Sequence, residues 1–179
     1  MSNPVPPILK PIGLVADTPP PHTPLKNFLE ERLRRTVDDQ SCWIPARWHP
    51  IRRQLAYLER ALFCLRRRKR YGAFVCIQQF IALYACYLAR LMRLSIPPLF
   101  LQPLIYVPRP GFFGRAWRHF FARALAHPSL RIAFCHSQTE VESYQQLFPA
   151  AAGKFRHLPF TIDPLDPPSS PADPPYLFS

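Results

Sequence analysis

Glycine is scarce in this chain, and so are the residue groupings that identify many enzymes. Only 5 of the 179 residues are glycine, and none forms a glycine-rich loop of the kind that holds a phosphate. The sequence also shows no paired carboxylates, no group at metal-ligand spacing and no nucleophile beside a base. It therefore leaves the catalytic residues unidentified, and it predicts no metal site and no cofactor.

Cysteine is sparse too, and its pattern argues against disulfides. The number of cysteines is odd, no two form a C-x-x-C pair, and most stand among apolar neighbours. The start of the chain, MSNPVPPILKPIG, has no long apolar run behind a basic segment, so it is unlike a secretory signal. We therefore expect a cytoplasmic protein whose thiols are reduced core residues. The cysteines are Cys42, Cys64, Cys76, Cys86 and Cys135.

Acidic residues are outnumbered by basic ones. The chain has 11 Asp and Glu against 23 Lys and Arg, a net charge of +12 and a pI near 10.1. This balance predicts an anionic partner, and charge alone leaves open nucleic acid, acidic lipid head groups and a phosphorylated small molecule. We expect no nucleic-acid partner, because no recognised nucleic-acid-binding module accompanies the basic residues.

The chain does contain enough apolar residues for one core. Apolar residues make up 48% of it, and 15 of the 24 prolines lie either in the first 24 residues or from Pro159 onward. The middle of the chain is therefore predicted to be the folded part. We expect strands at 12–16, 41–48, 73–77 and 99–106, with helices at 25–35, 51–70, 80–94 and 115–125.

The stretch 131–163 has the most complete set of start and stop signals for strands and helices. Residues 132–135 form a short apolar run, typical of a strand buried on both faces. Ser137 then precedes Glu140 by three residues, a capping box in which the hydroxyl accepts from the Glu140 amide and the carboxylate bonds back to the Ser137 amide. A helix follows, and a second strand is expected at 155–163. The alternation predicts an α/β, Rossmann-like single domain with a parallel sheet and helices on both faces.

Two expectations concern burial. The two tryptophans of the 41–48 segment can be buried or can form a rim contact, and we favour burial. In the 51–70 helix, apolar residues at spacings of three and four predict the face that packs on the sheet. That stripe consists of Ile51, Leu55, Leu58, Leu62 and Leu65.

The end of the folded region resembles the N-terminal domain of the group 1 glycosyltransferases. The resemblance rests on a strand that ends in Ser, a helix of the form Glu-x-x-x-Tyr-x-x-x-Phe-Pro, a Lys-Phe-x-x-x-Pro-Phe strand and a terminal Ile-Asp. Members of this family are retaining, nucleotide-sugar-dependent enzymes with two Rossmann-like domains, the GT-B architecture. The matching residues are Ser137, Glu140, Tyr144, Phe148, Pro149, Lys154, Phe155, Pro159, Phe160, Ile162 and Asp163.

The resemblance implies that the chain is half of such an enzyme. It divides the chain into a disordered, proline-rich start (1–10), an acceptor-side domain (11–163), a proline-rich linker (164–175) and the first strand of a missing donor-binding domain (176–179). The first domain would hold a glycan or lipid-linked acceptor, and the missing one the nucleotide sugar, which is a co-substrate. We therefore expect the isolated chain to bind nucleotide sugar weakly and to transfer no sugar.

Candidate substrate-binding residues lie where the predicted strands end, since ligands of open α/β sheets bind at the carboxyl ends of the strands. Some of these side chains have a structural alternative, because strand ends and helix caps use the same polar groups. The candidates are Asp17, Gln78, Gln102, Tyr106, Arg109, His136 and Ser137.

Membrane contact is the competing interpretation. Residues 73–89 carry no formal charge and approach the length of a bilayer span, although a buried strand and helix is favoured. The basic run at 66–70 can be a solvated helix end, or it can bind an anionic membrane or nucleic acid. Phe112 and Phe113 stand beside arginines, which suits peripheral contact with the inner face of the plasma membrane. The alternative function is a small basic membrane-associated protein without catalysis.

Overall fold

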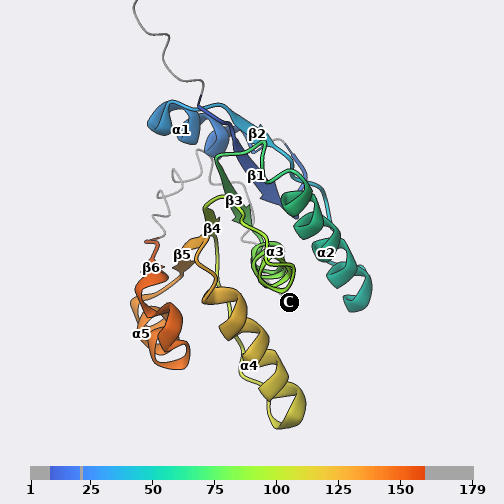
Figure 1. Ribbon diagram of the computed structural model, residues 1–179, viewed down its shortest axis with the longest axis vertical. Coiled ribbons are helices and arrows are strands. Elements are labelled where there is room, and N and C mark those ends of the chain that lie inside the picture. Colours follow the sequence, from blue (N-terminus) through green and yellow to red (C-terminus); the bar gives the residue numbers. More distant parts are fainter. Residues whose placement is uncertain (1–8, 21, 160–179) are drawn as a thin grey trace, which may run out of the picture.

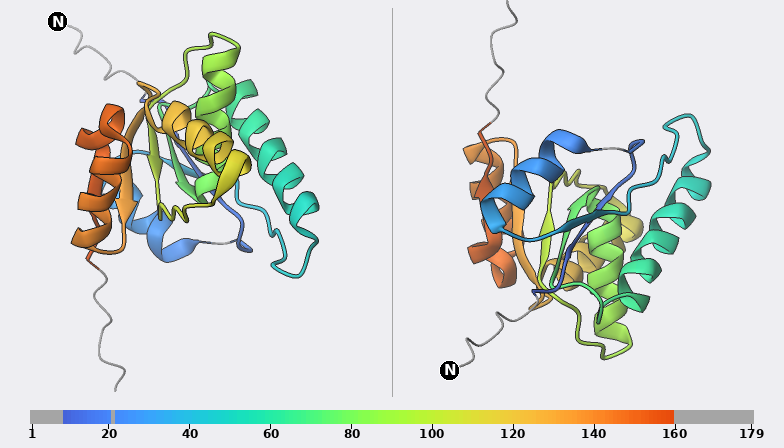
Figure 2. Two further views of the ribbon diagram at one scale, coloured as in Figure 1. Left: turned by 90° about the horizontal axis from the view of Figure 1, so that it is seen from below. Right: turned by 90° about the horizontal axis from the view of Figure 1, so that it is seen from above.

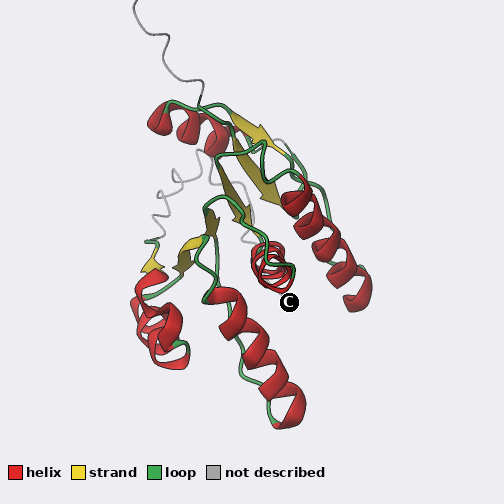
Figure 3. Cartoon of the chain, viewed as in Figure 1, coloured by secondary structure: helices red, strands yellow, loops and turns green. Residues whose placement is uncertain are grey.

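Six parallel strands form one sheet at the centre of the protein (Figure 1). The computed structural model describes residues 9–20 and 22–159, in which strands and helices alternate along the chain (Figure 3). The predicted α/β, Rossmann-like fold is therefore confirmed. The strands are β1 (Ile12–Ala16), β2 (Val37–Asp39), β3 (Ala73–Ile77), β4 (Leu99–Leu101), β5 (Leu130–Cys135) and β6 (Phe155–His157).

Helices cover both faces of the sheet, but unequally (Figure 2). Side chains of α2, α3, α4 and α5 share one apolar core with the sheet, whereas α1 packs against the opposite face in a smaller core. The helices are α1 (Thr23–Leu33), α2 (Pro50–Arg66), α3 (Gln79–Leu91), α4 (Gly111–Leu125) and α5 (Gln138–Leu147), followed by a 3-10 helix (Pro149–Lys154).

The order of the strands fixes where a ligand site is expected. The order is β2-β1-β3-β4-β5-β6, and every neighbouring pair is parallel. The chain steps from β1 to β2 in one direction, then crosses back and adds every later strand on the other side. The winding direction therefore changes between β1 and β3. Ligands of such sheets bind at the carboxyl ends of the strands at this point, which we call the switch point.

Alternation along the strands decides which core each side chain joins. Val15 and Cys76 belong to the core under α2–α5, whereas Leu14 belongs to the smaller core under α1. Strand β1 is buried along its whole length, because β2 and β3 flank it and helices pack on both of its faces. Gly13 permits this close packing, since a Cβ there would lie 2.7 Å from two ring carbons of Phe74.

Part of the sheet face under α1 stays open. Side chains from β3, β4 and β5, among them Val75 and Phe100, line a groove of about 690 Å³ there. The prediction that residues 132–135 are buried on both faces is therefore wrong. Ile132 and Phe134 are half-buried in this groove, because among the described residues no helix covers that side of β5.

The predicted strand at 41–48 is wrong, because this segment is a loop and β2 lies just before it. The loop nevertheless runs along the end of β1. The amides of Cys42 and Ile44 donate to the carbonyl oxygens of Ala16 and Asp17, at 3.1 and 2.9 Å. The segment is therefore bonded to the end of β1 without forming a strand.

Helix α2 buries a different face from the one that its leucines predict. Ile51 and Leu55 are 65% and 60% exposed, so the predicted stripe is wrong at its start. The buried side chains are instead Tyr57, Ala61 and Cys64, together with the last residue of the stripe. Small residues at 61 and 64 let α2 approach the sheet and α3 closely, which the longer leucines would prevent.

Several expectations concern residues that the structure does not describe. Most of the expected disordered start (1–8), the end of the last strand from residue 160, the linker at 164–175 and the strand at 176–179 all lie outside the described residues. In the described part, the helices are too short or too polar to cross a bilayer. The uncharged stretch 73–89 forms β3 and most of α3, as favoured from the sequence.

Candidate functional site

Polar side chains from three elements meet at the switch point. Asp17 follows β1, Gln78 follows β3 as the N-cap residue of α3, and Tyr57 reaches both from α2. Strand alternation brings the first two together: Asp17 stands two residues after Val15, and Gln78 two residues after Cys76, so both side chains point to the α2 side of the sheet.

The Asp17 carboxylate is the centre of this arrangement. Its Oδ2 accepts hydrogen bonds from the Tyr57 hydroxyl and from Gln78 Nε2, each at 2.9 Å. Gln78 Nε2 also lies 3.2 Å from the Tyr57 oxygen, and Arg53 Nη2 donates to that oxygen at 2.9 Å. This network uses Oδ2 and leaves Oδ1 outside it. We call these four residues, Asp17, Arg53, Tyr57 and Gln78, the switch-point cluster.

Packing and backbone contacts hold the cluster in place. The Tyr57 ring is buried and stacks on Phe80, with ring centroids 5.8 Å apart. Gln78 Oε1 accepts from the Phe80 amide at 3.3 Å, so one side chain both caps α3 and bonds the carboxylate. The Ser41 hydroxyl accepts from the Ala16 amide at 3.0 Å and ties the β2–α2 loop to the end of β1.

The electrostatics favour a neutral phenol beside the carboxylate. Burial raises the pKa of Tyr57, the hydrogen bond from Arg53 opposes this, and the bond to Asp17 adds to the rise. The phenol therefore stays protonated and donates to Asp17. Arg53 brings a positive charge, and its Nε is buried without a hydrogen-bond partner among the described residues. The cluster thus combines an anionic acceptor, an amide and a cation, which suits a ligand with hydroxyl groups.

An exposed tryptophan lies in the loop that runs along the end of β1. Trp43 lies between Cys42 and Ile44, whose amides are bonded to the end of β1, and its side chain is 60% exposed. The prediction of burial is therefore wrong for Trp43. Trp48 is half-buried against the main core, with the Arg52 guanidinium 3.9 Å from its ring centroid.

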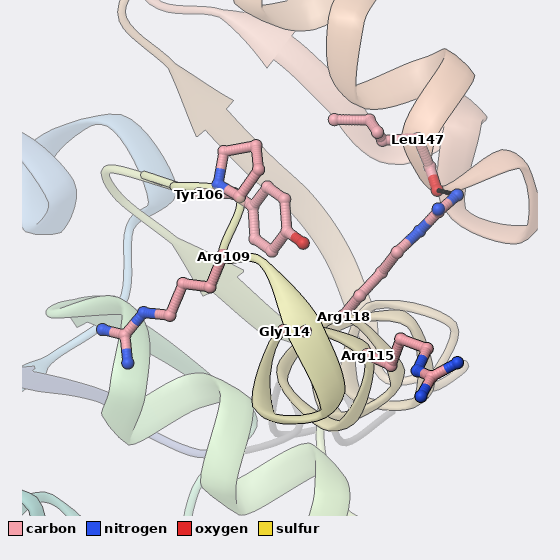
Figure 4. A pocket seen from close by; sticks show the side chains of 8 residues that line it. Tyr106, Arg109, Gly114, Arg115, Arg118 and Leu147 are labelled. Carbon is pink, nitrogen blue, oxygen red and sulfur yellow. Dashed lines mark hydrogen bonds between the residues drawn. The ribbon is translucent and has the colours of Figure 1, made fainter.

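Two of the predicted residues, Tyr106 and Arg109, lie at a separate basic pocket farther along the same edge of the sheet (Figure 4). Its volume is about 510 Å³, and it lies between the β4–α4 loop, the start of α4 and the end of α5. Tyr106 is buried, and its amide donates to the Tyr144 hydroxyl at 3.0 Å. The residues labelled around this pocket are Tyr106, Arg109, Gly114, Arg115, Arg118 and Leu147.

The remaining candidates lie elsewhere. Gln102 follows Leu101, which ends β4 and faces the main core, so alternation turns Gln102 into the groove on the opposite face. His136 and Ser137 stand at the start of α5, where the Ser137 hydroxyl accepts from the Glu140 amide at 3.1 Å. The Glu140 carboxylate accepts from the His136 amide at 2.7 Å. The predicted capping box is therefore confirmed, except that the carboxylate bonds one residue earlier than expected.

The sequence interpretation missed Arg53 and Tyr57. Both are on α2, whose leucine stripe drew attention to another face. The spacing of Tyr57, Ala61 and Cys64 is also helical and marks the face that is buried. That second face marks Tyr57 as buried, but its partners follow only from the strand order.

Neither a scan of the chain against protein-family models nor a search of curated proteins gives a match. Within residues 9–20 and 22–159, no three His, Cys, Asp or Glu side chains are grouped so as to hold a metal ion.

Proposed function

We propose that this chain is the acceptor-side domain of a retaining, nucleotide-sugar-dependent glycosyltransferase, and that the switch-point cluster binds a hydroxyl group of the acceptor. One observation carries the proposal: Asp17, Tyr57 and Gln78 come from three elements and share hydrogen bonds at the carboxyl edge of a parallel sheet. The resemblance of residues 137–163 to the group 1 glycosyltransferases supports the reaction class.

Each residue of the site has a distinct role. Asp17 Oδ1, outside the network, accepts a hydrogen bond from the acceptor hydroxyl, while Tyr57 and Gln78 fix the carboxylate through Oδ2. Arg53 orients the Tyr57 hydroxyl. The nucleotide sugar, as co-substrate, is held mainly by a second domain.

The proposal also includes a cytoplasmic location. All five cysteines are free, and four of them are buried. Unpaired thiols of this kind suit the reducing compartment of the cell.

Titration of the 179-residue chain with saccharides and with nucleotide sugars, in buffer without lipid, tests the proposal. We expect a saccharide acceptor to bind, nucleotide sugars to bind weakly and no transfer product to form. Asp17→Asn keeps the size of the side chain but removes its charge, and it should weaken saccharide binding about tenfold, as is typical for a hydrogen bond to a charged group.

The matched control is Glu59→Gln, which removes a carboxylate that pairs with Arg60 on the exposed side of α2. This variant should bind saccharides like the unmodified chain. Equal affinity of Asp17→Asn and the unmodified chain would place the acceptor elsewhere. Sugar transfer by the isolated chain would contradict its assignment as half of an enzyme.

A further inference from the structure

The most exposed aromatic pair in the described residues lies in the first turn of α4. The structure starts this helix at Gly111, earlier than the sequence predicts, so Phe112 and Phe113 belong to it. They are 71% and 82% exposed, and their ring centroids are 6.0 Å apart. Aromatic residues farther along α4, such as Phe121, pack into the main core instead. The pair therefore contributes little to the packing of the domain.

The segment that carries the pair is held firmly against the helix. The Arg109 guanidinium lies over the Trp117 ring, 4.8 Å from its centroid. Gly114 faces the Arg109 backbone so closely that a Cβ at this position would overlap the Arg109 carbonyl oxygen. The two phenylalanines are thus presented at a fixed place on the surface, which lowers the entropic cost of using them for binding.

In the part of the chain that the structure describes, the basic pocket next to the aromatic pair is lined by arginines and by no acidic residue. These arginines are Arg109, Arg115 and Arg118. The sequence has no Asp or Glu at all between Glu59 and Glu140. In Figure 4, Arg109 and Arg115 extend to opposite sides of the pocket, while Arg118 reaches the Leu147 carbonyl oxygen, 3.4 Å from its Nη2. The local field therefore attracts anions.

The combination of exposed rings and arginines favours one class of anionic partner. A free phosphate would use the arginines but leave the phenylalanines in water. A single-stranded nucleic acid stacks successive bases on parallel aromatic faces, whereas the planes of Phe112 and Phe113 are 76° apart. Protruding apolar rings beside cations match the boundary of a bilayer, where rings enter the acyl region and arginines meet the head-group phosphates.

We propose that the first turn of α4, with Phe112, Phe113 and the arginines of the basic pocket, is a contact site for a membrane that contains anionic phospholipids. The phenylalanines enter the bilayer interface, and Arg115 and Arg118 bind lipid phosphate. The inference depends on this surface and does not require the acceptor role of the switch-point cluster. Where that role also holds, a lipid-linked acceptor is the substrate class that reaches both, since the two sites share one edge of the sheet.

Sedimentation of the full chain with vesicles tests the proposal. We expect binding to vesicles that contain phosphatidylglycerol, little binding to vesicles of phosphatidylcholine alone, and release by salt. The double variant Phe112→Ser, Phe113→Ser should bind at least about tenfold more weakly, because buried apolar area sets interfacial affinity. The variant Arg115→Gln, Arg118→Gln should lose about fivefold per arginine.

The matched controls make the same kinds of substitution at positions outside α4. Phe28→Ser alters an exposed aromatic residue of α1, and Arg67→Gln, Arg68→Gln alters the basic run after α2. Both should bind vesicles like the unmodified chain. Loss of binding in the controls but not in the α4 variants would overturn the proposal. The same holds if the chain binds no vesicles, or if the α4 changes weaken binding only to inorganic phosphate or to single-stranded RNA.

Two further measurements separate the possible failures. Circular dichroism and the urea midpoint of each variant report whether the domain still folds, as expected for exposed positions. Saccharide binding without lipid reports on the switch-point cluster. A chain that binds saccharide but no vesicles overturns the membrane proposal and leaves the acceptor proposal standing.

Discussion

Tyr57 belongs both to the switch-point cluster and to the packing between α2 and α3. Its hydroxyl connects Arg53 to Asp17, and its ring fills the space between α2 and α3. We predict that Tyr57→Phe lowers the free energy of unfolding by about 1–2 kcal/mol, because buried partners of the hydroxyl lose a hydrogen bond while the ring remains. Urea denaturation measures this change.

Tyr84 provides the comparison for that prediction. Its hydroxyl makes one hydrogen bond, to Gln54 Oε1 at 2.7 Å, and the side chain is half-buried. Tyr84→Phe should therefore cost less than Tyr57→Phe. An equal or larger cost would show that the switch-point network contributes no more stability than a single part-buried hydrogen bond.

His127 should make the stability of the domain depend on pH. Burial lowers the pKa of this residue below its usual 6.5, and the charges of Lys154 and Arg90 act in the same direction. The folded state thus binds fewer protons than the unfolded state just below pH 6.5. The resulting stability is present above that pH and is lost as the pH falls toward the lowered pKa.

The variant His127→Asn tests this dependence. In the native protein, the Ser129 amide donates to His127 Nδ1 at 3.2 Å. The Asn side chain also offers an acceptor for this amide, but Asn does not titrate. We predict that the free energy of unfolding, measured by urea titration between about pH 7 and 5.5, falls less steeply in the variant. Parallel pH curves for the two proteins would contradict the assignment.

At the scale of elements, α5 owes its start to Ser137. The hydroxyl satisfies the Glu140 amide, one of the free amides of the first helical turn. Ser137→Ala should lower the free energy of unfolding by about 1 kcal/mol. Ser95→Ala, at an exposed position after α3, should change it little, and similar losses in the two variants would argue against the cap.

Elements were predictable where their signals are local. The capping box of α5 involves residues three apart, and β3 is an uninterrupted apolar run between a glycine and a polar pair, so both could be read from the sequence. Strand β2 could not, since Val37–Asp39 has one apolar residue and is a strand because β1 lies beside it. The buried face of α2 depends on where α3 packs, and the spacing of the α2 leucines gives no information about that position.

At the scale of the molecule, the site depends on strand order, which no local pattern encodes. Asp17 and Gln78 were both predicted at strand ends, but they meet only because β1 and β3 are neighbours. Gln102 was predicted by the same argument, but it points to the other face of the sheet. Leu101 pairs with Cys76, so Gln102 is level with Ile77, one residue before Gln78. Tyr57 then reaches the pair from a third element.

Strand order also predicts how stability is distributed through the sheet. Strands β1 and β3 each have two neighbours, whereas β2 and β6 are the edges of the described sheet. Amides of β1 and β3 should exchange with solvent at least about tenfold more slowly than those of β6, because edges open without global unfolding. Native-state hydrogen exchange measures this, and uniform protection across the sheet would contradict it.

The same order has a consequence for a chain that emerges from the ribosome. After β2, the strands join the sheet in the order in which they are synthesised: β3 beside β1, then β4, β5 and β6 each beside its predecessor. No later strand has to insert between two that are already paired. The sheet can therefore grow in one direction from β1 during translation: β2 stays one edge throughout, and the newest strand is at each stage the edge that the next strand extends.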